Sequence, residues 1–216
     1  MATNSNSKKG IIIGTIVLLA VLGWRGYNLY KSFSDDSGNS SNNQEHYFGV
    51  TTLNTNLVSD FSSVYKNKLA QALDGTITFP NGTTTKNGAL TVVNPDGKTT
   101  RQATSYVEYV EKNEVKSISD VIVKIKELES TSETKEMINL SLDYFTEAEK
   151  IYKTELVKVA KMIDDKAPKE AIIKFAEEED AKFQPILNAK KEKLFSVAIP
   201  YAQKNGLKVN VQNFGK

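Results

Sequence analysis

The chain contains no cysteine and a single histidine, His46. The absence of thiols excludes disulfides, thiolate zinc sites, iron–sulfur clusters, thiol catalysis and a lipid-modified cysteine anchor. A Ser-His-Asp triad or a multi-histidine metal site would depend on His46 alone, and this residue lies in a polar stretch. A chain without thiols is compatible with any redox compartment, so the missing cysteines do not locate the protein.

The chain also lacks a large excess of positive or negative charge, because its formal net charge is +2 over 216 residues. No strong overall field selects nucleic acid, so no nucleic-acid partner is predicted. The sequence has neither a phosphate-binding Gly-rich loop nor a Gly-x-Ser-x-Gly elbow. We therefore predict no cofactor, no metal site and no catalytic residues. The length suits one ordinary domain with appendages.

Long hydrophobic runs are rare, and the one present is Gly10–Trp24, with 15 residues and no charge. As a helix it would measure about 22 Å, which is less than the ~30 Å hydrocarbon core of a bilayer. Its flanks extend it, since Lys8 and Lys9 precede it and the amphipathic rings of Trp24, Tyr27 and Tyr30 suit the headgroup level. We predict a transmembrane anchor over residues 10–30.

Two other interpretations of this segment remain open. A basic start and a short apolar stretch are also typical of a cleaved signal peptide, although bulky Trp24 and charged Arg25 would follow the cut. A buried helix of a soluble core is the third reading. For an anchor, the positive-inside rule favours a cytoplasmic N-terminus, residues 1–9, with the domain in the periplasm or outside the cell.

Gly10 and Gly14 form a small-xxx-small motif within this run. Such spacing lets two membrane helices approach closely. We therefore consider a weak homodimer through the transmembrane helix, with Gly10 and Gly14 at the contact.

After the anchor, residues 31–46 are nearly all polar. Such a segment buries too little surface to offset the entropy of ordering it, so a flexible tether is predicted. Residues 47–216 form the predicted domain. Within it, residues 76–100 contain Asn-Gly and Asp-Gly pairs between Thr- and Val-rich segments. This pattern predicts a β-hairpin or small meander, with a mobile polar loop as the alternative.

Four stretches have apolar residues at helical spacing, and they predict a mainly all-α fold. The stretches run from about 51 to 73, from 104 to 128, from 134 to 163 and from 168 to 205. A polar gap at 112–114 suggests a kink in the second stretch, and Pro185 predicts a kink or break in the fourth. The short connections favour an antiparallel four-helix bundle with the β insertion between its first two helices.

Carboxylates occur at helical spacing without a histidine to complete a metal site. Glu108, Glu111 and Glu114 are three residues apart, and residues 177–180 form an acidic run. Because such charges usually lie on a solvated face, we expect both groups at the surface. Aromatic residues at core spacing, including Tyr152, are expected inside.

The C-terminal part of the chain is basic. Residues 181–216 contain seven lysines and one glutamate, whereas residues 47–180 contain 17 basic and 22 acidic residues. In an antiparallel bundle this part returns toward the membrane, where each lysine near an anionic surface contributes about 1 kcal/mol. The predicted contacts to lipid headgroups or an acidic partner are Lys190, Lys191, Lys193, Lys204 and Lys208. A solvated lysine face is the alternative.

These features predict a non-enzymatic, membrane-tethered protein that acts through protein contacts, as an envelope scaffold or accessory subunit. The expected contact surfaces are the turn-rich insertion and the basic C-terminal part. One alternative is a bundle that binds a lipid or small apolar ligand between helices opened at Pro185. The other is an envelope hydrolase that uses an unidentified pair of carboxylates.

Overall fold

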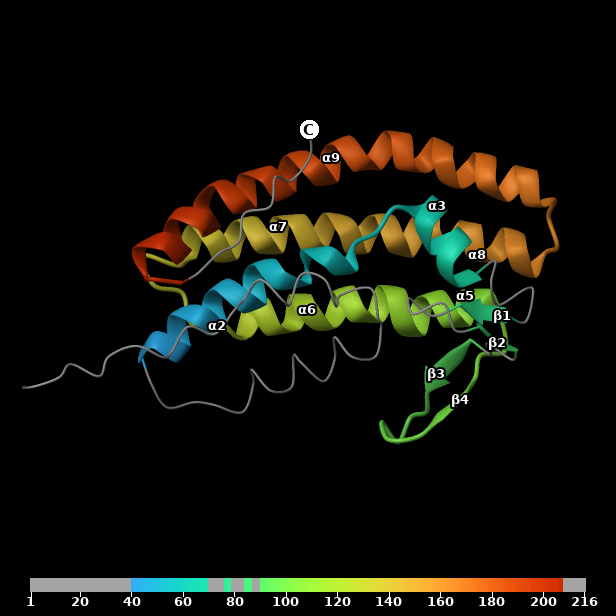
Figure 1. The fold of residues 1–216 in the computed structure, drawn as a ribbon, viewed down its shortest axis with the longest axis horizontal. Coiled ribbons are helices and arrows are strands. Elements are labelled where there is room, and N and C mark those ends of the chain that lie inside the picture. Colours follow the sequence, from blue (N-terminus) through green and yellow to red (C-terminus); the bar gives the residue numbers. More distant parts are fainter. Residues whose placement is uncertain (1–39, 70–75, 79–83, 87–89, 208–216) are drawn as a thin grey trace, which may run out of the picture.

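The computed structural model describes residues 40–69, 76–78, 84–86 and 90–207. The chain is mostly helical, which confirms the predicted all-α class. Figure 1 shows long helical stretches that lie side by side and alternate in direction. The predicted anchor and most of the predicted tether lie outside the described residues.

The first helical stretch differs from the expected single helix. It consists of α2 (Ser40–Thr52), the 3₁₀ segment η2 (Leu53–Leu57), α3 (Phe61–Val64) and the π-helical η3 (Tyr65–Leu69). Helix α2 begins inside the range predicted as a tether, because Tyr47, Phe48 and Val50 are buried in the core and hold it there. The stretch breaks at residues 58–60, and the side chain of Asp60 caps the new helix α3.

The insertion forms two antiparallel hairpins. Strand β1 (Thr76–Thr78) pairs with β2 (Thr84–Lys86), and β3 (Thr91–Val93) pairs with β4 (Thr100–Gln102). In the second hairpin the Gly97 N–H donates to the Asn94 carbonyl, and Gly97 has a φ of 67°. Pro95 lies between them at a turn position that its fixed φ suits. The predicted turn at Asp96-Gly97 is therefore confirmed.

The second and third helical stretches each contain a π-helical turn. The second comprises α5 (Tyr106–Tyr109), η4 (Val110–Val115) and α6 (Lys116–Glu127). The third comprises α7 (Lys135–Ile151), η5 (Tyr152–Leu156) and α8 (Val157–Asp164). The expected irregularity at 112–114 coincides with η4. A π turn adds one residue to the hydrogen-bonded ladder, which explains why the apolar pattern shifts there.

Helix α9 (Lys169–Lys204) follows without a break. The sequence predicted a kink or a break at Pro185. The break does not occur, and Figure 1 shows one long, arched helix. Pro185 and Pro200 are both exposed, whereas Leu187, Leu194 and Ala198 on the other face are buried. The hydrogen bonds lost at the prolines therefore lie on the solvent side, where water replaces them.

The helices pack into a bundle-like arrangement with two distinct ends. Helix α7 contacts α6 and α9, and α2 contacts α9, α6 and α7. At one end, which we call the junction end, the start of α2, the α6–α7 loop and the end of α9 meet (Figure 1). At the other, the hairpin end, α3, α5, the hairpins and the α8–α9 turn meet. The first described residue, Ser40, therefore lies at the junction end.

The core runs the length of the bundle and includes aromatic side chains. Phe145 and Tyr152 have no exposed area, and the ring of Tyr152 meets that of Phe61 edge-on at 5.6 Å between centroids. Tyr144 and Phe145 make a second edge-to-face pair at 5.0 Å. The prediction that aromatics at helical spacing lie inside is confirmed for these residues. Burying each such ring contributes on the order of 2–3 kcal/mol.

Candidate functional site

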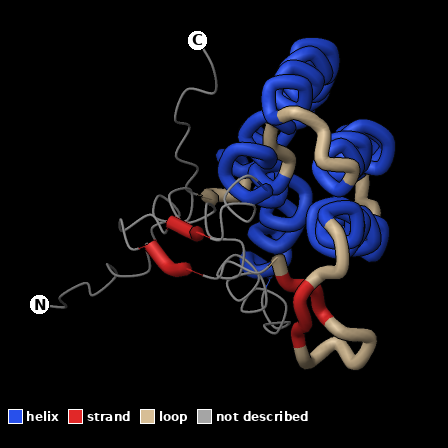
Figure 2. The backbone as a smooth tube through the Cα atoms, turned by 90° about the vertical axis from the view of Figure 1, so that its right-hand side faces the viewer, coloured by secondary structure: helices blue, strands red, loops and turns tan. Residues whose placement is uncertain are grey.

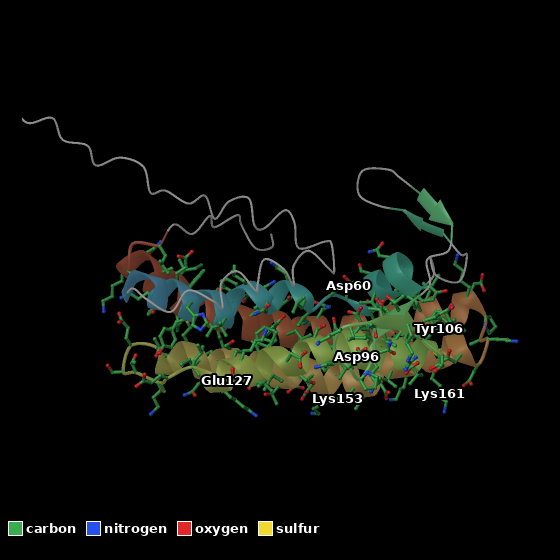
Figure 3. All side chains as sticks on the ribbon, turned by 90° about the horizontal axis from the view of Figure 1, so that it is seen from below. Asp60, Asp96, Tyr106, Glu127, Lys153 and Lys161 are labelled. Carbon is green, nitrogen blue, oxygen red and sulfur yellow. The ribbon has the colours of Figure 1, made fainter. Side chains whose placement is uncertain are left out.

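The hairpin end combines capped helix starts, buried tyrosines and an exposed hairpin. Helices α3 and α5 both begin there, and each is held by a carboxylate from another helix. Asp60 and Tyr106, labelled in Figure 3, mark these two helix starts. These features make the hairpin end the best candidate for a functional site among the described residues.

The start of α3 is capped by Asp180 from α9. The N–H groups of Phe61 and Ser62 donate to the two oxygens of Asp180 at 2.6 and 2.9 Å. The next N–H, of Ser63, donates to the Asp60 side chain at 2.7 Å, and that of Val64 donates to the Asp60 carbonyl. The first three N–H groups of the helix, which lack intrahelical partners, are thus satisfied by side chains, and the Val64 bond begins the regular helical ladder.

The start of α5 repeats this arrangement with Asp164 from α8. The N–H groups of Tyr106 and Val107 donate to the two Asp164 oxygens at 2.9 and 3.0 Å. The N–H of Glu108 donates to the Ser105 hydroxyl oxygen, which is the local cap. A carboxylate at a helix N-terminus also interacts favourably with the helix dipole. The two aspartates therefore clamp short helices onto the long ones.

A third contact holds the linker between α2 and α3. The Ser59 N–H donates to the Tyr152 hydroxyl at 2.7 Å, and that hydroxyl donates to the Ser59 carbonyl at 2.7 Å. One buried side chain thus satisfies both backbone groups of Ser59. Tyr152 lies in the π-helical turn η5, which directs it to this linker.

Replacing Asp180 with asparagine is expected to lower the free energy of unfolding by about 1–2 kcal/mol, because an amide keeps one acceptor and loses the charge at the helix start. Urea unfolding measures this change, and hydrogen exchange at the Phe61 and Ser62 amides locates it. Glu178→Gln is the matched control on the same helix, since its pair with Lys174 spans 3.9 Å at the surface. It should change stability by less than about 0.5 kcal/mol. Equal effects of the two substitutions would contradict the clamp.

Tyrosines gather around a buried glutamate where the π turns η4 and η5 contact each other. Glu114 is only 9% exposed, so the expectation of a solvated face is wrong for this residue. Burial, with a smaller contribution from Glu114, raises the pKa of Tyr109 and of Tyr152 well above the usual value. Burial alone raises the pKa of Tyr144. These phenols stay protonated and act as hydrogen-bonding groups of the core.

The hairpin β3–β4 presents one buried and one exposed face. Val92 is 1% exposed and points to the bundle, and strand β3 contacts α5 and η4. The Asn113 side-chain amide donates to the Thr91 carbonyl at 3.1 Å, which holds the β3 edge against η4. The opposite face is exposed and uncharged. Its residues are Thr91, Val93, Thr100 and Gln102.

Arg101 secures the second strand to α5. Its guanidinium donates to both oxygens of Glu108, and also to the Gln102 carbonyl at 3.0 Å. Glu108 in turn accepts from the Thr104 N–H and hydroxyl. These charge-assisted bonds lower the pKa of Glu108 far below its usual value. The hairpin is therefore a fixed part of the fold, and Figure 2 shows it beyond the edge of the helices.

The described lysines of the predicted contact surface differ in their partners and exposure. Lys190 pairs with both oxygens of Asp143 at 2.7 Å, and Lys204 pairs with Glu133 at 2.7 Å. Lys191 is half-buried, and burial lowers its pKa. Lys193 is exposed on α9. Asp143 of α7 and Glu133 of the α6–α7 loop thus partly offset the basic charge of α9, and lipid or acidic-partner binding stays a prediction.

Several predicted positions lie outside the described residues, namely Lys208 and the pair Gly10 and Gly14. Within the described ranges, none of the helices combines the length and apolar character needed to cross a bilayer. The same ranges contain no group of three or more His, Cys, Asp or Glu side chains arranged to hold a metal ion.

Sequence reasoning missed the residues that organise the hairpin end. Asp180 belongs to an acidic run predicted to lie at the surface, and it is half-buried. Glu179 beside it is buried, with its carboxylate paired to Lys182, so the surface prediction is wrong for Glu179. Asp164 directly follows the third predicted helical stretch, and the apolar spacing assigns it no role. The available signal was Asp60 and Ser105, each a strong N-cap residue before an apolar stretch. These two cap residues mark where α3 and α5 begin, but they do not indicate that Asp180 and Asp164 complete the caps.

Comparison with known proteins identifies no relative. No protein-family model, no curated protein and no solved structure matches the chain.

Proposed function

We propose that the protein is a membrane-tethered, extracytoplasmic helical protein that acts through protein contacts, as an envelope scaffold or accessory subunit without enzymatic activity. In this proposal residues 10–30 form a single transmembrane helix with the N-terminus in the cytoplasm. The described helices then form an antiparallel four-helix bundle beyond the membrane. The flanks of Gly10–Trp24 support the anchor.

The observation that carries the contact role is the rigid hairpin β3–β4 with its exposed uncharged face. Val93 on this face is 54% exposed, although a β-branched residue usually packs against neighbours. The hairpin lies at the hairpin end, away from the junction end where α2, the first described element, begins (Figure 1). A tether at one end and a presented surface near the other suit a protein that reaches a partner beyond the membrane.

Fractionation of the full-length chain in bacterial cells tests the anchor. The protein should pellet with membranes, start before Gly10 by N-terminal sequencing, and be digested by protease added outside spheroplasts. Replacing Leu18 and Leu19 with arginine should release it, because each charge at the centre of a membrane helix costs about 2.5–3.5 kcal/mol or more. Leu57→Arg with Val123→Arg adds the same charges at exposed positions and should leave it in the membrane fraction.

A soluble product that begins near Trp24 would overturn the anchor in favour of signal cleavage. Contact through the hairpin is tested separately by a photo-crosslinking residue at position 93 or at position 123, since Val93 and Val123 are equally exposed at 54%. Discrete adducts are expected from position 93 and not from position 123 on α6. The same adducts from both positions would contradict a specific hairpin surface.

A further inference from the structure

We infer that the free edge of strand β4 binds an extended segment of a protein partner by strand addition, and that this segment carries an acidic residue opposite Arg101. The inference rests on the proposed contact role of the hairpin and specifies the class of partner. It is built from the backbone pairing of the hairpin, the exposure of β4 and the position of one guanidinium.

The ladder of the hairpin determines which backbone groups face outward. The Asn94 N–H donates to the Thr99 carbonyl at 2.9 Å, and the Ala103 N–H donates to the Leu90 carbonyl at 2.7 Å. In an antiparallel pair, hydrogen-bonded and non-bonded positions alternate. The N–H and C=O groups of Thr100 and Gln102 therefore point away from β3, toward the open side of β4. The Gln102 carbonyl already accepts from the Arg101 guanidinium at 3.0 Å, so the two N–H groups and the Thr100 carbonyl are the groups left for an added strand.

The two edges of the hairpin are not equivalent. Strand β3 lies against α5 and η4, and its Thr91 carbonyl accepts from Asn113. All three residues of β4 are exposed. An open strand edge is a template for another strand, and proteins usually protect it with charges, prolines, bulges or very short strands. Strand β4 is only three residues long and carries Arg101 on its inner face, which limits pairing, but it contains no proline and its outward-facing side chains, Thr100 and Gln102, are uncharged.

Arg101 determines the chemistry that the added strand requires. Its side chain lies on the same face of the hairpin as Val92 and is 41% exposed. Some of its N–H groups donate to Glu108 and to the Gln102 carbonyl. A guanidinium has five N–H donors, so donors remain for a further acceptor. A carboxylate on the residue opposite Arg101 would meet them. Small β-branched residues on either side suit the exposed face.

A second copy of this chain fits the edge less well. Two copies of β4 could pair in an antiparallel register along their full length. In that register Thr100 lies opposite Gln102, and Arg101 lies opposite Arg101 of the other copy. Like charges directly opposite each other destabilise a strand pair. A different protein with an acidic residue at that position is therefore the favoured occupant, in a peptide-recognition mode that uses main-chain hydrogen bonds for affinity.

The test uses the full-length chain in detergent and a labelled peptide, acetyl-Thr-Val-Thr-Asp-Thr-Val-Thr-amide, measured by fluorescence anisotropy and by the amide chemical shifts of Thr100 and Gln102. Binding is expected, weak because β4 is short. A peptide with lysine in place of the central aspartate should bind about two- to fivefold less tightly. Gln102→Pro removes an outward N–H without removing a ladder bond, and should weaken binding at least about tenfold.

Val123→Thr is the control, since it changes an exposed residue on α6 outside the hairpin; it should bind the peptide normally. Circular dichroism checks that both variants fold. No binding, or equal losses in both variants, would overturn the inference, as would self-association of the chain that Gln102→Pro abolishes. Crosslinks from position 93 without peptide binding would contradict strand addition and leave the proposed contact role intact. Peptide binding by a chain that is cleaved and soluble in cells would contradict the membrane anchor and leave strand addition intact.

Discussion

Raising the pH above 10 is expected to unfold the bundle cooperatively. Burial raises the pKa of Tyr109, Tyr144 and Tyr152 in the folded state, while in the unfolded chain each phenol titrates near its ordinary value of 10.0. The unfolded state therefore loses protons that the folded state keeps. The stabilisation from these tyrosines is complete below pH 10 and is lost as the pH rises toward the folded pKa values.

The expected size of this effect follows from the proton difference. Each tyrosine that stays protonated only in the folded state lowers the free energy of unfolding by about 1.4 kcal/mol per pH unit. Three such residues give a slope of about 4 kcal/mol per pH unit, against a typical total stability of about 5–15 kcal/mol. Unfolding is thus expected between about pH 11 and 13. Tyr201, whose pKa burial raises to about 12, adds to the loss over part of this range.

Phenolate absorbance and far-UV circular dichroism, followed together against pH, check the prediction. The absorbance change of these shielded tyrosines should appear in the same narrow pH interval in which the helical signal disappears. Tyr144→Phe serves as the control, because it removes one of the three phenols and should reduce the slope by about 1.4 kcal/mol per pH unit. A gradual rise centred on pH 10 with an unchanged helical signal would show that these tyrosines are not shielded.

Tyr152→Phe is expected to cost about 2–4 kcal/mol of stability. The substitution keeps the ring and its edge-on contact with Phe61, and it removes the hydroxyl that serves both backbone groups of Ser59 at 2.7 Å. Each backbone group left unsatisfied away from water costs about 1–3 kcal/mol. Urea unfolding measures the total, and faster hydrogen exchange at the Ser59 amide should accompany it.

Tyr144→Phe provides a close comparison for this effect. Both tyrosines are buried, and both rings form edge-to-face pairs. The Tyr144 hydroxyl, however, reaches only the Thr55 carbonyl, at 3.4 Å, which is longer than a normal hydrogen bond from a hydroxyl. Its loss should cost less than about 1 kcal/mol. If the two substitutions cost the same, the Ser59 contact does not stabilise the linker.

Much of the fold could be predicted from local pattern. The apolar residues of the third helical stretch repeat at helical spacing, and Phe145 and Tyr152 are buried as that spacing requires. The turn at Asp96-Gly97 was readable because glycine there adopts a positive φ that few other residues tolerate. Periodicity and turn chemistry depend on neighbours in the sequence, and so they are visible without a structure.

The first helical stretch and Pro185 show where local pattern fails. An apolar spacing continued across residues 58–60, yet the chain breaks there because Asp60 and Asp180 together cap a new helix start. Pro185 was expected to kink or break its helix, and the break does not occur because the other face of α9 is held in the core. In both places packing between distant segments outweighs the local preference.

The sequence by itself determined that the protein is mainly helical, which faces of its helices are apolar, and where its tight turn lies. The tertiary structure alone decided that Asp180 caps a helix 119 residues earlier in the chain, that Glu114 is buried, and that Lys190 is paired with Asp143. It also decided that the outward edge of β4 is open. The physical reason is that backbone preference and apolar spacing act between near neighbours, whereas carboxylate capping, ion pairing and strand edges depend on which distant segments the packed core brings together.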